Sequence, residues 1–357
     1  MGEHRVAGLL NTVVIAAVAA VAYTDWVIVA DVSLAYLYVL PVALCALVNP
    51  LPFTIALGAI CTFLGDIFGP PAESLYWRVV HNIVYLASFL VVGFLVTLIA
   101  RQRDRMADEV RRQRDAYERD LILAAQVQHR VLPKPLTLPG IDIAAEMKTA
   151  RLLGGDYYDF FPVSDDVVDI VIADVSGKGA AAALLMPSLA VALRLRAREL
   201  ERPAEVIADL DEVLKQMTNS ATFVTMFYAR FNRVSRVLQY ANAGHNPPVL
   251  LKAGSCETQL MDAAGGPILG ILSGANYSDA SITLAPGDIL TLFTDGVTEQ
   301  ENEQGEEFSV DRLESVICRE GSASAAEVVQ HVSGAVAAFA GETEQADDLT
   351  LVVLKVL

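Results

Sequence analysis

Aspartates that follow apolar runs are the residues of this 357-residue chain best suited to chemistry. Residues 170–175 read Ile-Val-Ile-Ala-Asp-Val, and Ser-Gly-Lys-Gly follows at 176–179. The Val- and Ile-rich run is typical of a buried strand, so Asp174 is expected at a strand end beside a tight turn. A carboxylate in that setting suits a hard cation such as Mg²⁺ or Mn²⁺. Taken alone, the pattern more often marks an aspartate that caps the next helix.

Other aspartates stand in the same setting. They are Asp156 after two glycines, Asp295 after the apolar run 289–293, and Asp347 or Asp348 before the closing strand 351–356. Carboxylates crowded into one site repel one another unless cations neutralise them. Two divalent ions about 3.5–4 Å apart can activate water for phosphoester hydrolysis. The sequence therefore predicts a two-metal hydrolytic site built from strand-end carboxylates.

The elements expected around these aspartates mix strands with pairs of helices. A strand is expected in the aromatic run after Asp156, and further strands are expected at 141–148, 167–175, 222–231, 237–241, 248–252, 277–284, 288–293 and 351–356. The helices are expected at 178–200, 203–218, 310–319 and 325–339. Pro203 suits a helix start, and the apolar residues that follow it at helical spacing are interpreted as core.

Four apolar runs fill the first hundred residues. They lie at 6–23, 27–48, 51–68 and 79–100. Each approaches the ~20 residues that a helix needs to cross a bilayer. The first run could be a signal peptide, but three more follow directly, which favours a membrane bundle of four helices. Arginines crowd residues 101–114, which predicts cytoplasmic termini. We expect a multi-pass protein of the inner (plasma) membrane, in contact with lipid, with its catalytic domain in the cytoplasm.

Three ionisable residues, Asp31, Asp66 and His81, lie within or near these runs. Ionisable groups inside a membrane are functional candidates by default. The alternative is that Asp31 and Asp66 lie close enough to the span ends to reach headgroups and water. The bundle could sense a ligand or only anchor the chain.

A charged connector follows, without Gly or Pro until Pro133. Seven residues of the connector are spaced alternately four and three positions apart. They are Val110, Arg114, Tyr117, Leu121, Ala124, Gln128 and Val131. This spacing predicts a coiled-coil seam, and hence a homodimer through the connector. The alternative is a solvated single helix that serves as a spacer. The expected division is a transmembrane module at 1–100, a helical linker at 101–138 and a catalytic domain at 139–357.

Charge and cysteine content narrow the function classes. The net charge of −17 argues against a nucleic-acid partner, because phosphate backbones are bound by Lys and Arg. Four cysteines, Cys45, Cys61, Cys256 and Cys318, are far apart and show no C-x-x-C spacing. Neither a zinc site nor a disulfide framework is indicated, and a reducing interior is expected for the last two.

Five motifs together resemble the metal-dependent PPM-type serine/threonine phosphatases, in their SpoIIE-type bacterial branch. They are Gly-Gly-Asp156-Tyr-Tyr-Asp159, Asp174-Val-Ser-Gly-Lys-Gly, Ala-Gly-His245-Asn-Pro-Pro, Thr-Asp295-Gly-Val-Thr-Glu299 and Asp347-Asp-Leu-Thr. The resemblance covers about residues 120–357, because the segment 125–133 also looks like that branch's lead-in. It implies an α+β fold, a four-layer α-β-β-α sandwich.

The resemblance also implies roles for residues. Asp174 would bridge two Mn²⁺ or Mg²⁺ ions, Asp156 and the carbonyl of Val175 would hold the second ion, and Asp295 and Asp347 would hold the first. Asp348 and Asp159 would support these ligands without touching metal. No substrate-binding residue is assigned, because Arg151 lies near the family's phosphate-binding arginine but without a certain register. His245 is either a general acid or a loop histidine bonded to backbone.

The substrate implied by the resemblance is a phosphoserine or phosphothreonine on an anti-sigma-factor antagonist of the STAS fold. Water activated by the two metals would attack phosphorus directly, without a phosphoenzyme. One rival is a non-catalytic metal-binding module that relays a membrane signal by holding a partner, but such a module need not keep every ligand. Another is a transporter or receptor with a regulatory tail, which the complete motif set argues against.

Overall fold

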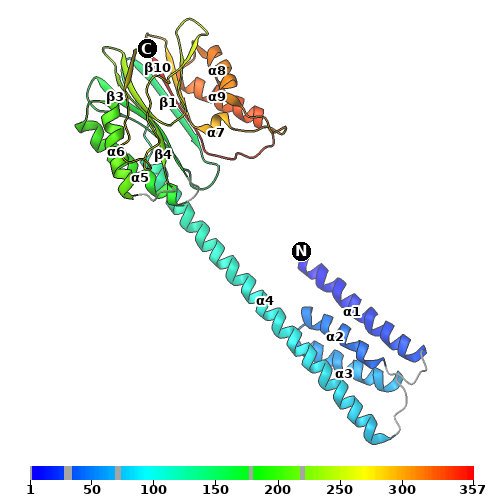
Figure 1. The fold of residues 1–357 in the computed structure, drawn as a ribbon. Coiled ribbons are helices and arrows are strands. Elements are labelled where there is room, and N and C mark those ends of the chain that lie inside the picture. Colours follow the sequence, from blue (N-terminus) through cyan, green and yellow to red (C-terminus); the bar gives the residue numbers. More distant parts are fainter. Residues whose placement is uncertain (1, 28–33, 69–73, 177–179, 218–221) are drawn as a thin grey trace. The chain divides into compact units, whose positions relative to one another are not determined.

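The computed structural model describes residues 2–27, 34–68, 74–176, 180–217 and 222–357 (Figure 1). The chain divides into two compact units, Met1–Ala116 and Tyr117–Leu357. One helix, α4 (Leu75–Val131), begins in the first unit and ends in the second. It contains no Pro or Gly within the connector, so nothing in its sequence interrupts the helix there.

The first unit consists of apolar helices. They are α1 (Gly2–Val27), the short 3₁₀ helix η1 (Ala35–Tyr38), α2 (Val39–Val48), α3 (Leu51–Phe68) and the first part of α4. Their small core gathers around Tyr38, Val42, Cys61 and Phe89. Among the described residues, three helices are long and apolar enough to cross a membrane by length and composition, namely Gly8–Val27, Leu51–Phe68 and α4.

The second apolar run differs from the prediction of one span over 27–48. Helix α1 extends through Val27, and the following apolar helix, Ala35–Val48, is shorter than a span. Among the described residues, therefore, a fourth helix of spanning length is not observed. Asp31 lies outside the described residues.

Two of the three candidate ionisable residues, Asp66 and His81, have described side-chain neighbours in this unit. Asp66 near the end of α3 accepts hydrogen bonds from Arg78, at 2.8 Å from Nε and 2.5 Å from the terminal nitrogen. His81 lies between Trp77 and Tyr85 along one side of α4, with ring centroids 6.3 and 6.4 Å away. Asp66 is therefore part of an ion pair near the end of α3.

The second unit contains two antiparallel sheets of five strands each. Sheet A has the order β1 (Ile141–Lys148), β10 (Leu349–Val356), β9 (Ile289–Phe293), β6 (Val249–Leu251) and β7 (Thr258–Leu260). Sheet B has the order β2 (Asp156–Pro162), β3 (Val167–Val175), β4 (Val224–Asn232), β5 (Val237–Ala243) and β8 (Ala280–Thr283). The helices are α5 (Ala180–Glu199), α6 (Pro203–Met217), α7 (Asp295–Thr298), α8 (Ser309–Ile317), η2 (Cys318–Glu320) and α9 (Ala325–Ala340).

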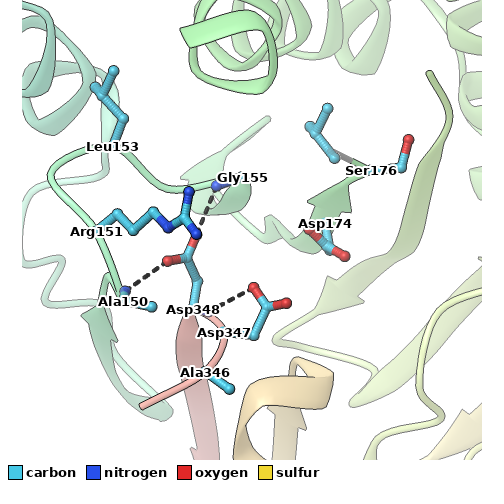
Figure 2. A pocket seen from close by; sticks show the side chains of 10 residues that line it. Ala150, Arg151, Leu153, Gly155, Asp174, Ser176, Ala346, Asp347 and Asp348 are labelled. Atoms are coloured by element: carbon cyan, nitrogen blue, oxygen red, sulfur yellow. Dashed lines mark hydrogen bonds between the residues drawn. The ribbon is translucent and has the colours of Figure 1, made fainter. Parts of the chain in front are cut away.

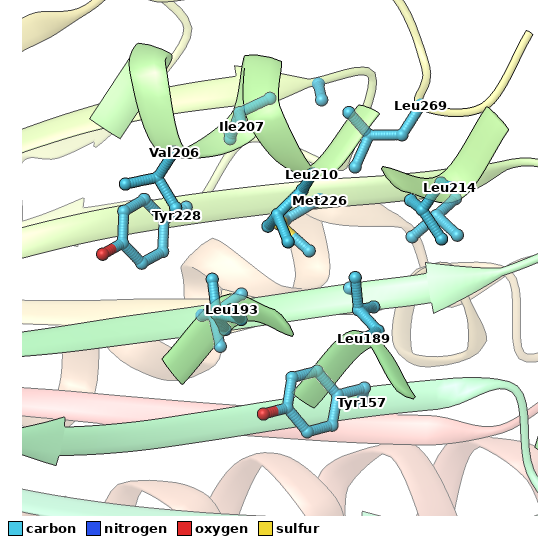
Figure 3. Close-up of a cluster of buried hydrophobic side chains, with 14 of the residues drawn as sticks. Tyr157, Leu189, Leu193, Val206, Ile207, Leu210, Leu214, Met226, Tyr228 and Leu269 are labelled. Carbon is cyan, nitrogen blue, oxygen red and sulfur yellow. The ribbon is translucent and has the colours of Figure 1, made fainter. Parts of the chain in front are cut away.

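Three apolar layers hold this unit together. Ile170 and Phe227 of sheet B meet Leu290 and Val352 of sheet A between the two sheets. Helices α5 and α6 cover the outer face of sheet B, where side chains such as Leu193 and Leu210 pack on the strands (Figure 3). Helices α8 and α9 cover sheet A. Both faces of each sheet are therefore buried, which is why β3 reads as a continuous apolar run. The predicted α-β-β-α sandwich is confirmed.

The cysteines correct the sequence-based expectation. Cys256, just before β7, and Cys318, at the start of η2, form a disulfide with their Cα atoms 4.8 Å apart. They are 62 residues apart in sequence, so no local spacing announces the bond. Cys45 and Cys61 are free and buried.

Candidate active site

Asp156 and Asp174 lie opposite each other at one end of sheet B, where β2 begins and β3 ends. Asp156 is 2% exposed. Its Oδ2 accepts hydrogen bonds from Thr294 at 2.8 Å and Thr350 at 2.6 Å. Because the hydroxyls of Thr294 and Thr350 both contact Oδ2, Oδ1 is the oxygen available to another ligand.

The pKa of Asp156 is raised well above its usual value. Burial is the largest cause, and repulsion from Asp174 and Asp348 adds to it, while the hydrogen bonds from the two threonines act in the opposite direction. A buried carboxylate beside like charges ionises readily only when a cation is present. Asp156 therefore has the electrostatics expected of a metal ligand.

Asp348 holds the loop that leads to Asp156. Its Oδ1 accepts a hydrogen bond from the amide of Ala150 at 2.8 Å, and its Oδ2 accepts one from Gly155 at 2.6 Å. A Cβ on Gly154 would lie 2.5 Å from Asp348 Oδ2. A side chain at position 154 would thus crowd this carboxylate where the loop closes on it. On its other side the loop is bonded to Gln128 of α4.

Asp295 and Asp347 come together at the facing end of sheet A. Asp295 is the first residue of α7, and a Cβ on the next residue, Gly296, would lie 2.0 Å from the carbonyl oxygen of Asp348. Asp347 Oδ1 accepts a hydrogen bond from the amide of Asp348 at 2.9 Å. The two carboxylates share a neighbour, Glu299, whose pKa is raised by burial, then by Asp295, Glu307 and Asp347.

A pocket opens where these loops meet (Figure 2). It is lined by Ala150, Arg151, Leu153, Gly155, Asp174, Val175, Ser176, Ala346, Asp347 and Asp348. Arg151 and Asp348 both line this pocket, and Asp174 and Asp347 face the same space (Figure 2). The pocket thus combines one cation with carboxylates from both sheets. Asp156 and Asp295 are not among the residues that line this pocket.

The donor types fit Mg²⁺ or Mn²⁺, because all the candidate ligands are oxygen atoms. Within the described residues, however, no group of three or more His, Cys, Asp or Glu side chains is close enough to hold one ion. The carboxylates lie instead as two pairs, Asp156 with Asp174 at the end of sheet B and Asp295 with Asp347 at the end of sheet A. Because like charges repel, cations would be needed to bring the two pairs close to each other.

The family described as Stage II sporulation protein E (SpoIIE) matches residues 164–357, more than half of the chain. The chain belongs to the SpoIIE family. Phosphoserine phosphatase RsbU of Bacillus subtilis (strain 168) is 29% identical over 79% of this chain and 83% of RsbU. Phosphoserine phosphatase RsbP of the same organism is 27% identical, but the chain covers 45% of its length.

Solved structures agree on the fold. The SiaA-PP2C domain of Pseudomonas aeruginosa is 23% identical, with a TM-score of 0.59 over 68% of this chain and 98% of that domain. The RsbU and RsbW domains of Rv1364c from Mycobacterium tuberculosis are 28% identical, with a TM-score of 0.54 over 63% of this chain and 61% of theirs. This SpoIIE-family chain has the PP2C fold and is a serine/threonine phosphatase.

Asp159 does not lie with the other site residues of this SpoIIE-family chain. It is three positions beyond Asp156 on β2, so its side chain points to the opposite face of the sheet. There it accepts hydrogen bonds from Arg194 of α5 at 2.7 and 2.9 Å and from the Tyr157 hydroxyl at 2.8 Å. The hydrogen bonds from Arg194 attach α5 to sheet B. The expected support of the metal ligands by Asp159 is therefore corrected.

His245 is buried, with 5% of its surface exposed. Its Nδ1 lies 2.8 Å from the Thr225 hydroxyl, and Asn242 is hydrogen-bonded to both the amide and the carbonyl of its main chain. Burial lowers its pKa to about 4. A neutral histidine that does not line the pocket is poorly placed to act as a general acid.

Sequence reasoning missed Thr294, Thr350 and Glu299 as members of the site. Each lies inside a motif that was noticed for its aspartate, either directly before Asp295 or within four residues of a candidate ligand. Their positions inside these motifs could have identified them, but the motifs were interpreted through their aspartates alone. Gln128 was interpreted as a seam residue, whereas it is buried against Gly154.

Proposed function

We propose that this SpoIIE-family phosphatase is anchored in the plasma membrane and dephosphorylates a STAS-domain antagonist of an anti-sigma factor. The observation that supports it most is the pairing of Asp156 with Asp174 beside a pocket that also contains Arg151. The names of the relatives RsbU and RsbP, both phosphoserine phosphatases, agree with a phosphoserine substrate. Dephosphorylation would let the antagonist capture the anti-sigma factor and so control sigma-factor activity.

The proposed metal ligands follow the arrangement of the two sheets. Asp174 would bridge two Mn²⁺ or Mg²⁺ ions, with Asp156 and the Val175 carbonyl on one, and Asp295 and Asp347 on the other. When bound, such ions acidify water and neutralise phosphoryl oxygens. Asp348 keeps the Asp156 loop closed through its bonds to Ala150 and Gly155. Because the threonine hydroxyls donate to Oδ2, Oδ1 of Asp156 would be the oxygen available to a metal ion.

Arg151 is the residue that we propose for phosphate binding. Its exposed guanidinium shares the pocket with Asp174 and Asp347. Guanidinium groups bind phosphoryl oxygens through two parallel hydrogen bonds. Arg151 would therefore orient the phosphoryl group while the carboxylates position the ions.

The membrane module would comprise residues 1–100, the linker 101–138 and the catalytic domain 139–357, which would lie in the cytoplasm. A homodimer through α4 is supported by two seam residues, Val110 and Tyr117, which are each 64% exposed. The seam would end before Gln128, because the side chain of Gln128 is hydrogen-bonded to Gly154. The dimer would bring two membrane modules and two catalytic domains together.

The test is phosphate release by the full-length protein in detergent or lipid discs. A STAS-domain protein phosphorylated on serine is supplied as the substrate, together with Mn²⁺, Mg²⁺ or a chelator. We expect release only with metal, and no release from the same protein phosphorylated on tyrosine. Stable binding of the phosphoprotein with no phosphate release would favour the rival function, a non-catalytic signalling module.

A further inference from the structure

A polar row crosses the end of sheet B and continues beyond the carboxylates. Asp156 pairs with Asp174, and Asp174 pairs with Thr225 of β4. Residues paired across neighbouring strands project to the same face of a sheet. Thr225 is in turn hydrogen-bonded to Nδ1 of His245 at 2.8 Å. His245 is thus the last member of the row that contains the proposed bridging ligand.

The position of the His245 ring is fixed by the turn that carries it. Asn242 donates to the His245 carbonyl at 2.9 Å and accepts from its amide at 2.8 Å. Gly244 between them has φ +68°, which favours glycine, and a Cβ there would lie 2.5 Å from the Ile268 side chain. The ring is therefore held by backbone geometry as well as by burial.

The other ring nitrogen, Nε2, is buried and makes no hydrogen bond in the part of the chain that the structure describes. Burial lowers the pKa of the ring, and the backbone of Phe293 at the end of β9 acts in the opposite direction. The hydrogen bond with Thr225 is therefore the contact that links the His245 side chain to the strands of the site.

We propose that His245 is a positioning residue that holds Thr225 and, through the pairing of β4 with β3, the strand end that carries Asp174. The fixed imidazole would keep this carboxylate where it can reach the proposed ions. It touches neither substrate nor metal. This inference rests on the proposed two-metal site, and it adds a residue to which no role at that site has been given.

The experiment measures Mn²⁺ affinity by titration calorimetry on the metal-free, full-length protein, and it needs no turnover. His245→Phe removes both ring nitrogens, and Thr225→Val removes only the hydroxyl with little change of shape. Outer partners of metal ligands typically contribute about 10- to 100-fold to metal affinity. We therefore expect each variant to raise the Mn²⁺ dissociation constant by about tenfold or more.

Three further variants make the result specific. His245→Asn returns an amide near the position of Nδ1 and should recover part of the affinity. The double variant should bind no more weakly than the weaker single variant, because both changes break one hydrogen bond. Thr291→Val, a matched control on β9, removes a hydroxyl that is buried and unpartnered among the described residues; it should leave the affinity unchanged.

Wild-type Mn²⁺ affinity in Thr225→Val would overturn the inference, and so would additive losses in the double variant. If His245→Phe fails to fold, as melting without metal would reveal, Thr225→Val decides the question. Asp174→Asn separates this inference from the proposed function. If that change also leaves Mn²⁺ binding intact, the two-metal site itself is wrong. If it abolishes binding while Thr225→Val does not, only the role of His245 is wrong.

Discussion

The side-chain amide of Gln128 is paired with the main chain of Gly154. Its Nε2 donates to the Gly154 carbonyl at 2.6 Å, and its Oε1 accepts from the Gly154 amide at 3.3 Å. Gln128 is 3% exposed and lies in the last turn but one of α4. The next residues of the loop are Gly155, which is bonded to Asp348, and Asp156. A shift of this part of α4 would therefore act directly on a proposed metal ligand.

Replacing Gln128 with Ala should loosen this loop. The Gly154 carbonyl and amide would lose their partners, and an unsatisfied buried polar group costs about 1–3 kcal/mol. We expect lower stability by that amount and a higher Mn²⁺ concentration for half-maximal activity. Gln126→Ala is the matched control, because Gln126 is on the same helix but exposed. Equal behaviour of the two variants would show that the Gln128 contact does not support the site.

The strands and motif positions could be read from local sequence, because burial on both faces gives continuous apolar runs. The expected strands 141–148 and 167–175 coincide with β1 and β3. Period-two alternation could also have placed Asp159 on the face opposite Asp156. The partners of Gln128 and Cys256 could not be read in this way, because the residues that they contact are 26 and 62 positions away. Such pairs depend on how the layers pack.

Arg151 provides a test of the phosphate-binding role. Arg151→Ala should raise KM for the phosphoprotein and lower kcat/KM by about tenfold or more, which corresponds to about 1.4 kcal/mol of transition-state binding. Arg151→Lys should recover only part, since an ammonium group cannot form two parallel bonds. Arg198→Ala removes an equal charge from an exposed position on α5. A matching loss in Arg198→Ala would point to general charge attraction instead of a specific contact.

The disulfide should stabilise the catalytic unit. Cys256 and Cys318 close a loop of about 62 residues, and bonds of this kind contribute about 2–4 kcal/mol by restricting the unfolded chain. Cys256→Ser should lower the free energy of unfolding by that amount under oxidising conditions, and Cys318→Ser should match it. In reductant, both variants should resemble wild type. A difference from wild type that persists in reductant would assign the effect to packing of the thiols.

The buried state of His245 has a consequence for pH dependence. Its folded pKa, about 4, lies below its usual 6.5, so the folded state favours the neutral ring. The contribution of the neutral ring to the free energy of unfolding is complete above pH 6.5. It is lost as pH falls toward 4, by roughly 3 kcal/mol in total for a pKa shift of this size. The stability of wild type relative to His245→Phe should therefore decline over that window, as measured by urea unfolding in chelator. A constant difference would contradict the burial of a neutral ring.

Asp174→Asn in the full-length protein tests the central claim most directly, because this change keeps the size of the side chain and removes its charge. Phosphate release from phosphoserine STAS protein is measured against Mn²⁺ concentration, with Asp165→Asn as an exposed, charge-matched control. We expect Asp174→Asn to lose at least ~10²-fold in turnover and to bind Mn²⁺ weakly, while its melting temperature in chelator is maintained. Near-normal turnover, or release by wild type in chelator, would contradict the two-metal account.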